Sequence, residues 1–199
     1  MPPAVVFFPG ASGAGQFWAP VADRLPSDWG TRLLSWPGAG SEQHDPAVAG
    51  YDDLVARAAA TVERRSDVVA QSMGGVVAVG LALTHPEKVR RLVLVATSGG
   101  IDVGAFGAED WRDEYALEFP NAASWVTEQR VDHSAELSAI SVPTCLIWGD
   151  ADPISPVAIG SALASALPNS VLHVVAGGTH MVAHERPDEI ASLIIEHLG

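Results

Sequence analysis

Residues 67–75 read Asp67-Val68-Val69-Ala70-Gln71-Ser72-Met73-Gly74-Gly75. An apolar run that leads into a serine among small residues predicts a strand turning sharply into a helix, with the hydroxyl at the turn. Ala70 and Gly74, two residues before and after the serine, are small enough for so tight a reversal. Such a turn holds its serine in a sparsely populated backbone conformation, which proteins usually tolerate only for function. Ser72 is therefore the first candidate for a reactive residue.

The composition is that of a folded, acidic protein. The chain has 199 residues, of which 48% are hydrophobic, and this suits one domain spanning residues 1–199 with a full core. Eleven Lys and Arg oppose 24 Asp and Glu, which gives a formal net charge of -13. Because this charge repels phosphate backbones and anionic lipids, we expect no nucleic-acid partner and no membrane association.

Two further features bear on the cellular compartment. Cys145 is the only cysteine, so no internal disulfide can form, and its place in an apolar run predicts a buried small residue. The apolar run at residues 4–8 is too short for a signal sequence or a membrane span, and no basic region precedes it. We expect a cytoplasmic location.

Short apolar or β-branched runs alternate with helical patterns along the chain. Most of the runs are nearly continuous, as expected for strands buried on both faces of a parallel sheet. They predict strands at residues 4–8, 31–35, 67–71, 91–96, 144–148 and 170–175. Apolar residues at helical spacing predict helices at residues 17–25, 54–62 and 76–84 and from about Pro187 to the C-terminus. This alternation indicates an α/β fold with a doubly wound, mostly parallel sheet of about six strands.

Residues 102–139 interrupt the alternation with an unusually long connection. They hold the aromatic residues Phe106, Trp111, Tyr115, Phe119 and Trp125 among several carboxylates. Long insertions in compact domains are usually functional lids or disordered segments, and the aromatic residues favour an ordered, short helical lid. We expect Trp111, Trp125 and Phe106 to line a substrate pocket beneath it.

Two later strands end in residues that could activate a serine. A serine hydroxyl needs a neighbouring base, and that base needs a third group to orient it. Asp150 and Asp152 follow the strand at residues 144–148, and His180 follows the strand at residues 170–175. The order Ser72, Asp152, His180 is the chain order of the triad in this kind of fold. Asp150, and Asp102 after an earlier strand, remain alternative acids.

With these motifs, the chain resembles the α/β-hydrolase superfamily, in particular its compact, cofactor-free serine hydrolases. The resemblance rests on the elbow, on Gly149-x-x-Asp152 and on Gly177-x-x-His180, in that order, and it extends from Ala4 to Leu198. It implies that Ser72 is the nucleophile, His180 the general base and then acid, and Asp152 the carboxylate that orients the histidine.

The resemblance also implies an oxyanion hole built from backbone amides. One amide should be that of Met73, at the positive end of the following helix. The other should come from the loop after the first strand, where the matching residue is Ala11. Relatives commonly carry His-Gly in this loop, whereas this chain has Pro9-Gly10, so the hydrogen bonds that the histidine makes are lost.

A second departure concerns the start of the sheet. Relatives usually have a two-stranded hairpin before the strand that residues 4–8 match, and we expect this sheet to lack it. The strand at residues 31–35 should then form an uncovered edge, which proteins usually protect. We expect a monomer or a homodimer paired through this edge.

Several other residues receive plainer interpretations. His180 and His184 have a spacing that could bind zinc on a helix, but glycines precede His180 and no suitable glutamate follows, so we expect no metal. Trp148 should be a core residue, while Trp36 could line the mouth of the site. Asp132 and His133 should form a solvated loop pair.

The expected function is hydrolysis of carboxylic esters, or of related acyl derivatives such as thioesters, through a Ser-His-Asp triad and an acyl-enzyme. No cofactor is expected. An alternative on the same fold is a C–C bond hydrolase or lyase that uses the triad as a base. An alternative of another class is a non-catalytic ligand-binding pseudoenzyme, against which the intact triad argues.

Overall fold

The centre of the molecule is one parallel sheet of six strands. The computed structural model describes residues 4–62 and 64–199. The strands are β1 (Ala4–Phe8), β2 (Gly30–Leu33), β3 (Ser66–Gln71), β4 (Val89–Val95), β5 (Thr144–Gly149) and β6 (Ser170–Val175). Their order across the sheet is β2-β1-β3-β4-β5-β6, and all five pairings are parallel. The expected doubly wound parallel sheet is confirmed, with strand ends displaced by at most two residues.

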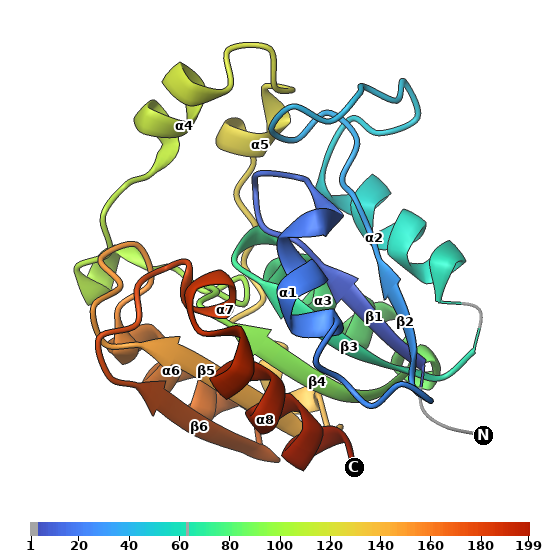
Figure 1. Cartoon of the computed structure of the whole chain (residues 1–199). Helices are drawn as coiled ribbons and strands as arrows, with labels where there is room; N and C mark the ends of the chain where they lie inside the picture. The colour runs from blue at the N-terminus through green and yellow to red at the C-terminus, as the bar shows by residue number, and fades with distance from the viewer. Residues whose placement is uncertain (1–3, 63) are drawn as a thin grey trace.

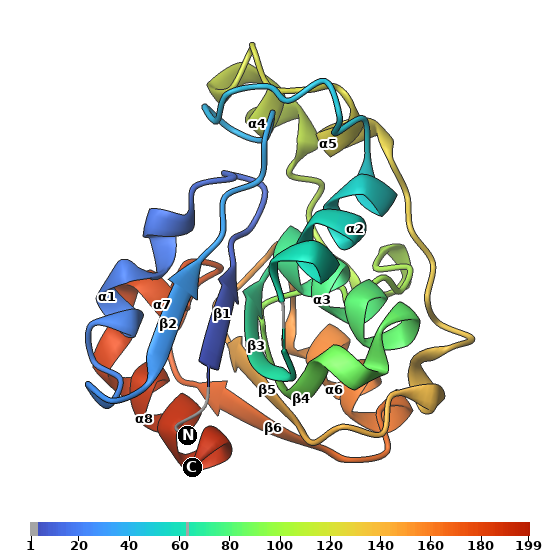
Figure 2. The ribbon, with the colours of Figure 1, turned by 90° about the vertical axis from the view of Figure 1, so that its right-hand side faces the viewer.

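Helices cover both faces of this sheet (Figures 1 and 2). One face carries α2 (Tyr51–Thr61), α3 (Met73–Thr84) and α6 (Val157–Ala166). The other carries the 3-10 turn η1 (Gly15–Trp18), α1 (Ala19–Ala22), the short α7 (Val182–Glu185) and α8 (Pro187–Leu198). A further 3-10 turn, η2 (Pro86–Lys88), joins α3 to β4. No helix in the described ranges is both long and apolar enough to cross a membrane.

The near-continuous apolar strands follow from this two-sided burial. In β1, Val6 and Phe8 pack against the α2–α3 side, while Val5 and Phe7 pack against the α1–α8 side. Successive side chains of a strand point to opposite faces, so a strand covered on both sides needs apolar residues at every position.

Cys145 is a packing residue, as the sequence predicted. It is free and 1% exposed, in β5 on the face covered by α8. Burial raises the pKa of its thiol to about 12, so the group stays protonated and unreactive.

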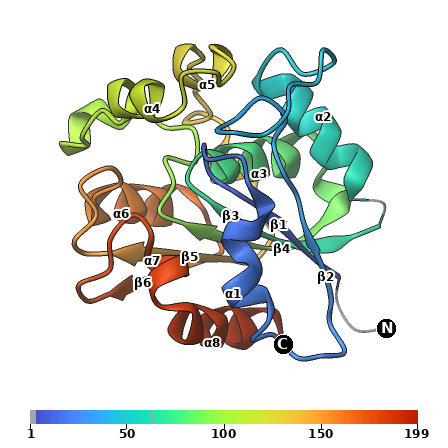
Figure 3. The ribbon, with the colours of Figure 1, turned by 45° about the horizontal axis from the view of Figure 1, so that its top comes forward.

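The segment 102–139, called the lid segment below, joins β4 to β5 and contains four short helical pieces. These are η3 (Gly104–Phe106), α4 (Arg112–Glu118), α5 (Trp125–Glu128) and η4 (Leu137–Ala139). Helices α4 and α5 lie together at one end of the molecule, at the top of Figure 1 and turned forward in Figure 3.

Backbone hydrogen bonds tie the lid segment to three loops of the sheet. Glu109 N donates to Pro153 O at 2.9 Å, Ala123 N to Gly38 O at 2.7 Å, and His133 N to Gly100 O at 2.7 Å. In this structure the segment is therefore anchored to the body of the fold at several points.

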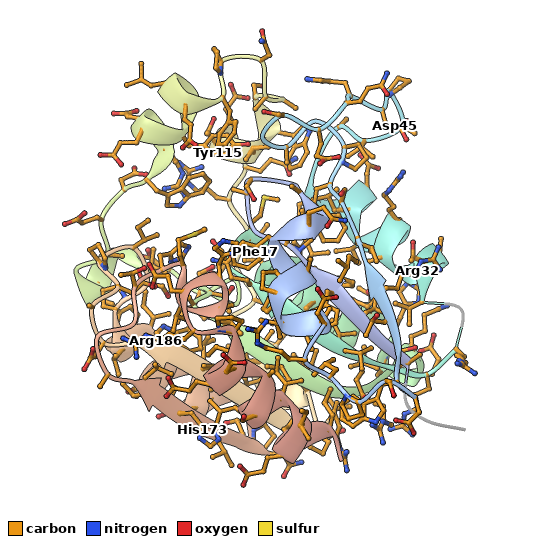
Figure 4. All side chains as sticks on the ribbon, in the orientation of Figure 1. Phe17, Arg32, Asp45, Tyr115, His173 and Arg186 are labelled. Carbon is orange, nitrogen blue, oxygen red and sulfur yellow. The ribbon has the colours of Figure 1, made fainter. Side chains whose placement is uncertain are left out.

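Strand β2 forms one edge of the sheet and β6 the other. Residues Gly30, Thr31 and Arg32 of β2 are exposed, and the charged side chain of Arg32 lies at this edge (Figure 4). The expected position of β2 at an uncovered edge is confirmed, and its pairing in a homodimer stays a prediction.

Two side-chain expectations need correction or completion. His133 is mostly buried rather than solvated, because its Nε2 lies 2.8 Å from the Tyr51 hydroxyl and its side chain is 13% exposed. Trp36 is fully buried, and its Nε1 donates to Pro9 O at 2.7 Å, so it belongs to the core and not to the mouth of the site. Trp148 is a core residue, as expected.

Candidate active site

Ser72 stands between the end of β3 and the first turn of α3. Its backbone has φ 51° and ψ −123°, a conformation that side-chain-bearing residues rarely adopt. The turn requires glycine at positions 74 and 75. A Cβ on Gly74 would lie 2.3 Å from Pro9 O, and a Cβ on Gly75 would lie 2.5 Å from Thr97 Oγ1. The expected sharp turn from strand to helix at Ser72 is thus present, and its glycines let the first turn of α3 pack closely against Pro9 and Thr97.

The loops after β5 and β6 approach each other through glycines as well. A Cβ on Gly149 would lie 2.1 Å from Gly178 O, and Ala151 N donates to that same oxygen at 2.9 Å. This close backbone contact brings the residues that follow each glycine together at the carboxyl edge of the sheet.

Ser72, His180 and Asp152 form a continuous hydrogen-bonded line. His180 Nε2 lies 3.0 Å from Ser72 Oγ, and His180 Nδ1 lies 2.8 Å from Asp152 Oδ2. The Asp152 side chain is fully buried, and that of His180 is 16% exposed. The other carboxylate oxygen of Asp152 accepts from the amides of Ile154 and Ser155, both at 2.9 Å. A buried carboxylate bound in this way holds the imidazole with Nε2 turned to the serine.

The two alternative acids lie elsewhere. Asp150 is exposed, and its Oδ1 accepts from Gly177 N at 2.6 Å, which fixes the turn before His180. Asp102 is exposed in the lid segment, where its Oδ1 accepts from Gly104 N at 3.0 Å. Of the three carboxylates, the structure brings only Asp152 into contact with His180 within the described residues.

The two expected oxyanion-hole amides lie on opposite sides of the elbow. Met73 is the first residue of α3, directly after Ser72. Ala11 follows Gly10, which lies beside the elbow, since a Cβ on Gly10 would come within 3.2 Å of Ser72 Cβ. In the described part of the chain neither amide donates a hydrogen bond. Both are therefore free to bind an oxygen that carries negative charge.

A cavity of about 610 Å³ opens above Ser72 and His180. Its walls come from α2, from the start of α3 and from the lid segment. Of the three aromatic residues expected to line a substrate pocket, Trp111 and Trp125 line this cavity, whereas Phe106 is not among the lining residues and packs against the core. Carboxylates of the lid segment outnumber its guanidinium groups along the wall, which contains Asp102, Glu109, Asp110 and Asp132 against Arg112 and Arg130.

His184, the other half of the zinc spacing, lies away from the line. It is exposed and stacks on Phe17, with ring centroids 6.0 Å apart (Figure 4 labels Phe17). Within the described residues, no group of three or more His, Cys, Asp or Glu side chains could hold a metal ion.

The sequence did not predict the side chains that bind the backbone of Ser72, His180 and Ala11. The Gln71 side chain is buried, and its Nε2 donates to His180 O at 3.2 Å. Thr97 Oγ1 donates to Ser72 O at 2.7 Å, and the Tyr115 hydroxyl binds the loop of Ala11. The position of Gln71 directly before the serine was the one available signal, because that residue must sit under the elbow.

A family model described as alpha/beta hydrolase fold matches residues 3–123. The chain belongs to this family. The match spans β1 to α4 and so includes the elbow and the Ala11 loop.

Curated relatives of the chain include an esterase and a hydrolase of a dienedioate. A pimeloyl-[acyl-carrier protein] methyl ester esterase of Chromobacterium violaceum is 28% identical, over 98% of this chain and 94% of the relative. A 2-hydroxy-6-oxononadienedioate/2-hydroxy-6-oxononatrienedioate hydrolase of Paraburkholderia phymatum is 24% identical, over 96% of this chain and 84% of the relative.

Solved structures share the fold along the whole chain. The crystal structure of a hydrolase from Pseudomonas aeruginosa superimposes with a TM-score of 0.83 at 20% identity, covering 100% of this chain and 90% of the other. At this identity the likeness concerns the fold alone.

Proposed function

We propose that this α/β-hydrolase is a serine hydrolase that cleaves carboxylic esters or related acyl derivatives such as thioesters. The observation that carries the proposal is the hydrogen-bonded line from Ser72 through His180 to the buried carboxylate of Asp152. A strained elbow that presents a hydroxyl to a base at 3.0 Å has no evident use in a protein that only binds.

In the proposed reaction, His180 Nε2 takes the proton of Ser72 Oγ as that oxygen attacks the substrate carbonyl carbon. The tetrahedral intermediate collapses, and the leaving alkoxide takes the proton from Nε2, which leaves an acyl-serine. Water then attacks the acyl group with His180 as base, and collapse releases the acid and restores the Ser72 hydroxyl. Asp152 stays ionised and stabilises the imidazolium that forms twice in the cycle.

The amides of Met73 and Ala11 would bind the carbonyl oxygen as its negative charge develops. The amide of Met73 gains from the dipole of α3, a helix of twelve residues that starts at this point. Fixed donors cost no reorganisation during the reaction, which is why such sites contribute much of the catalysis in acyl transfer.

The names of the relatives support this proposal and its alternative. The relative from Chromobacterium violaceum is named as a methyl ester esterase, which favours ester cleavage. The relative from Paraburkholderia phymatum is named as a hydrolase of a 2-hydroxy-6-oxo dienedioate, which makes C–C bond cleavage the second candidate. In that reaction His180 would act mainly as a base.

The test of the proposal is a panel of p-nitrophenyl esters of graded acyl length, with the parent protein and Ser72→Ala. We expect the parent to hydrolyse the shorter esters and Ser72→Ala to lose about 10⁴ to 10⁶ in kcat. Activity that survives in Ser72→Ala would remove Ser72 from its role.

Mass spectrometry separates the two candidate reactions. A stalled acyl or phosphonyl adduct on the Ser72 peptide, formed with an ester analogue, supports the ester mechanism. Turnover of a vinylogous 1,5-diketone without such an adduct supports C–C cleavage. Folded parent protein that binds ligands but turns over neither class would favour the non-catalytic alternative.

A further inference from the structure

The hydroxyl of Tyr115 joins the lid segment to the loop that carries Ala11. It donates to Ala11 O at 2.9 Å and accepts from Gly40 N at 2.6 Å. Tyr115 belongs to α4 and is 7% exposed, so these bonds are shielded from water (Figure 4). A single side chain from the lid segment therefore bridges the loops that follow β1 and β2.

The two loops are in direct contact at this point. A Cβ on Gly40 would lie 2.0 Å from Ser12 O, and a Cβ on Gly13 would lie 2.4 Å from Ala39 O. Both glycines have positive φ, 56° at Gly40 and 75° at Gly13, so the backbone here depends on glycine. The Tyr115 hydroxyl binds one backbone group of each loop, Ala11 O and Gly40 N, and so holds the two loops together beside Ala11.

The orientation of the Ala11 N–H depends on the two peptide units on either side of the Ala11 Cα. This N–H belongs to the same planar unit as the Gly10 carbonyl and points the opposite way. Gly10 O accepts from Gly13 N at 3.1 Å, which holds that first unit. The second unit contains the Ala11 carbonyl, and Tyr115 is its hydrogen-bond partner.

Earlier parts of the loop are held by indole groups. Trp18 Nε1 donates to Phe8 O at 2.9 Å, and Trp36 Nε1 donates to Pro9 O at 2.7 Å. Pro9 has no N–H and no polar side chain, so it donates no hydrogen bond to the loop. Hydrogen bonds thus hold each carbonyl from Phe8 to Ala11, and only the last of them comes from the lid segment.

We propose that Tyr115 is a positioning residue that fixes the Ala11 amide for the oxyanion hole, so that the lid segment takes part in building the catalytic site. This inference rests on the proposed function. Tyr115 touches no reacting atom and acts through the loop.

Packing keeps the hydroxyl in place and neutral. The Tyr115 ring contacts the rings of Trp111 and Phe119, with centroids 5.4 Å and 5.0 Å away. Burial raises the pKa of the phenol above its usual value of about 10. The group therefore keeps its proton, and its bond to Ala11 O, at neutral pH.

The experiment compares the parent protein with Tyr115→Phe, which removes only the hydroxyl. We expect kcat for a p-nitrophenyl ester to fall about tenfold, less than the roughly 10²–10³ lost when an oxyanion donor itself is removed. KM should stay about constant, because the loss concerns the transition state. The inhibition constant of a trifluoromethyl ketone, which forms a tetrahedral oxyanion on serine, should rise by about the same factor as kcat falls.

The matched control is Tyr51→Phe. The Tyr51 hydroxyl also donates to a backbone carbonyl, Val76 O at 2.8 Å, and lies 2.8 Å from His133 Nε2, but it does not touch the Ala11 loop. Tyr51 lines the cavity, so loss of its hydroxyl should change binding of the ester and of the ketone by the same factor. Both variants should lose thermal stability, whereas only Tyr115→Phe should lose affinity for the ketone relative to its affinity for the ester. Equal losses of relative affinity in the two variants would overturn the proposal, as would unchanged kcat and ketone affinity in folded Tyr115→Phe.

If Tyr115→Phe does not fold, Phe119→Leu replaces it. This variant keeps the hydroxyl but removes the ring that packs on Tyr115, so kcat and ketone affinity should fall together, and unchanged values would overturn the proposal. A parent protein without Ser72-dependent esterase activity would instead contradict the proposed function, which keeps the two failures distinct.

Discussion

At the scale of single residues, Asp152 is distinguished by what its two oxygens bind. Oδ1 accepts from two backbone amides, and Oδ2 faces His180 Nδ1. Both amides can only donate, so the atom that faces them must be an acceptor. An asparagine here would keep its carbonyl oxygen toward the amides and turn its NH₂ group to the imidazole.

We predict that Asp152→Asn lowers kcat by about 10⁴, because the NH₂ group forces Nδ1 to accept and leaves the proton on Nε2, where it cannot take another from Ser72. Steady-state kinetics on a p-nitrophenyl ester measure the loss, and unfolding curves show whether the fold is intact. Asp150→Asn is the control. Its oxygen can still accept from Gly177 N, so kcat should fall by less than about tenfold. A loss of about 10⁴ in Asp102→Asn, with Asp152→Asn still active, would transfer the role of the acid to Asp102.

The sequence was informative at this scale where the backbone itself restricts the residue type. Ser72 lies between small residues, and Gly149 and Gly177 precede Asp152 and His180, because tight turns and close approaches admit little else. No such restriction on the neighbouring residues points to Tyr115 or Gln71 in the sequence. Their contacts join residues 104 and 109 positions apart, and only the folded chain brings those residues together.

At the scale of elements, the ends of β5 and β6 determine the distance between Asp152 and His180. Gly149 and Gly178 touch through their backbones, and Asp152 and His180 follow within three residues. A side chain at Gly149 would meet Gly178 O at 2.1 Å and Gly178 C at 2.3 Å. Backbone atoms cannot move aside as a flexible side chain can, so the two loops would have to separate.

We predict that Gly149→Ala destabilises the fold by about 1–3 kcal/mol and lowers kcat by about 10²-fold, because a displacement of about 1 Å between reacting groups costs that much. Urea unfolding and ester kinetics measure the two effects. Gly30→Ala in β2 is the matched control, since no atom lies within 4 Å of its added Cβ. It should leave kcat unchanged. Similar losses in both variants would show that the contact between the loops does not position the triad.

Elements were predictable where their burial is simple. All six strands were expected within two residues. The four inner strands are nearly continuous apolar runs because they are covered on both faces, while the edge strands β2 and β6 are partly exposed. The helix α6 was not singled out, since its residues Val157–Ala166 are almost uniformly small or apolar and show little helical periodicity. The path of the lid segment was not predictable either, because long-range bonds such as Glu109 N to Pro153 O fix it.

At the scale of the whole molecule, charge sets what approaches the site. The protein has a formal net charge of -13. The wall of the cavity also contains four carboxylates, those of Asp102, Glu109, Asp110 and Asp132. Arg112 offsets one of these carboxylates, because its Nη1 binds Asp110 Oδ1 at 2.7 Å. That hydrogen bond lowers the pKa of Asp110, which therefore stays ionised at neutral pH. Asp102, Glu109 and Asp132 then face only Arg130 among the lining residues, so the wall keeps a negative charge.

We predict that the protein discriminates against anionic acyl groups, and that salt relieves the discrimination. p-Nitrophenyl hemisuccinate should have a lower kcat/KM than p-nitrophenyl butyrate at about 0.01 M salt, where the Debye length is about 30 Å. At about 1 M salt that length falls to about 3 Å, so the anionic ester should gain and the neutral ester should change little. Glu109→Gln, which removes one charge from the cavity wall, should narrow the gap at low salt. An anionic ester that is the better substrate and slows as salt rises would mean that Arg112 and Arg130 attract it despite the surrounding carboxylates.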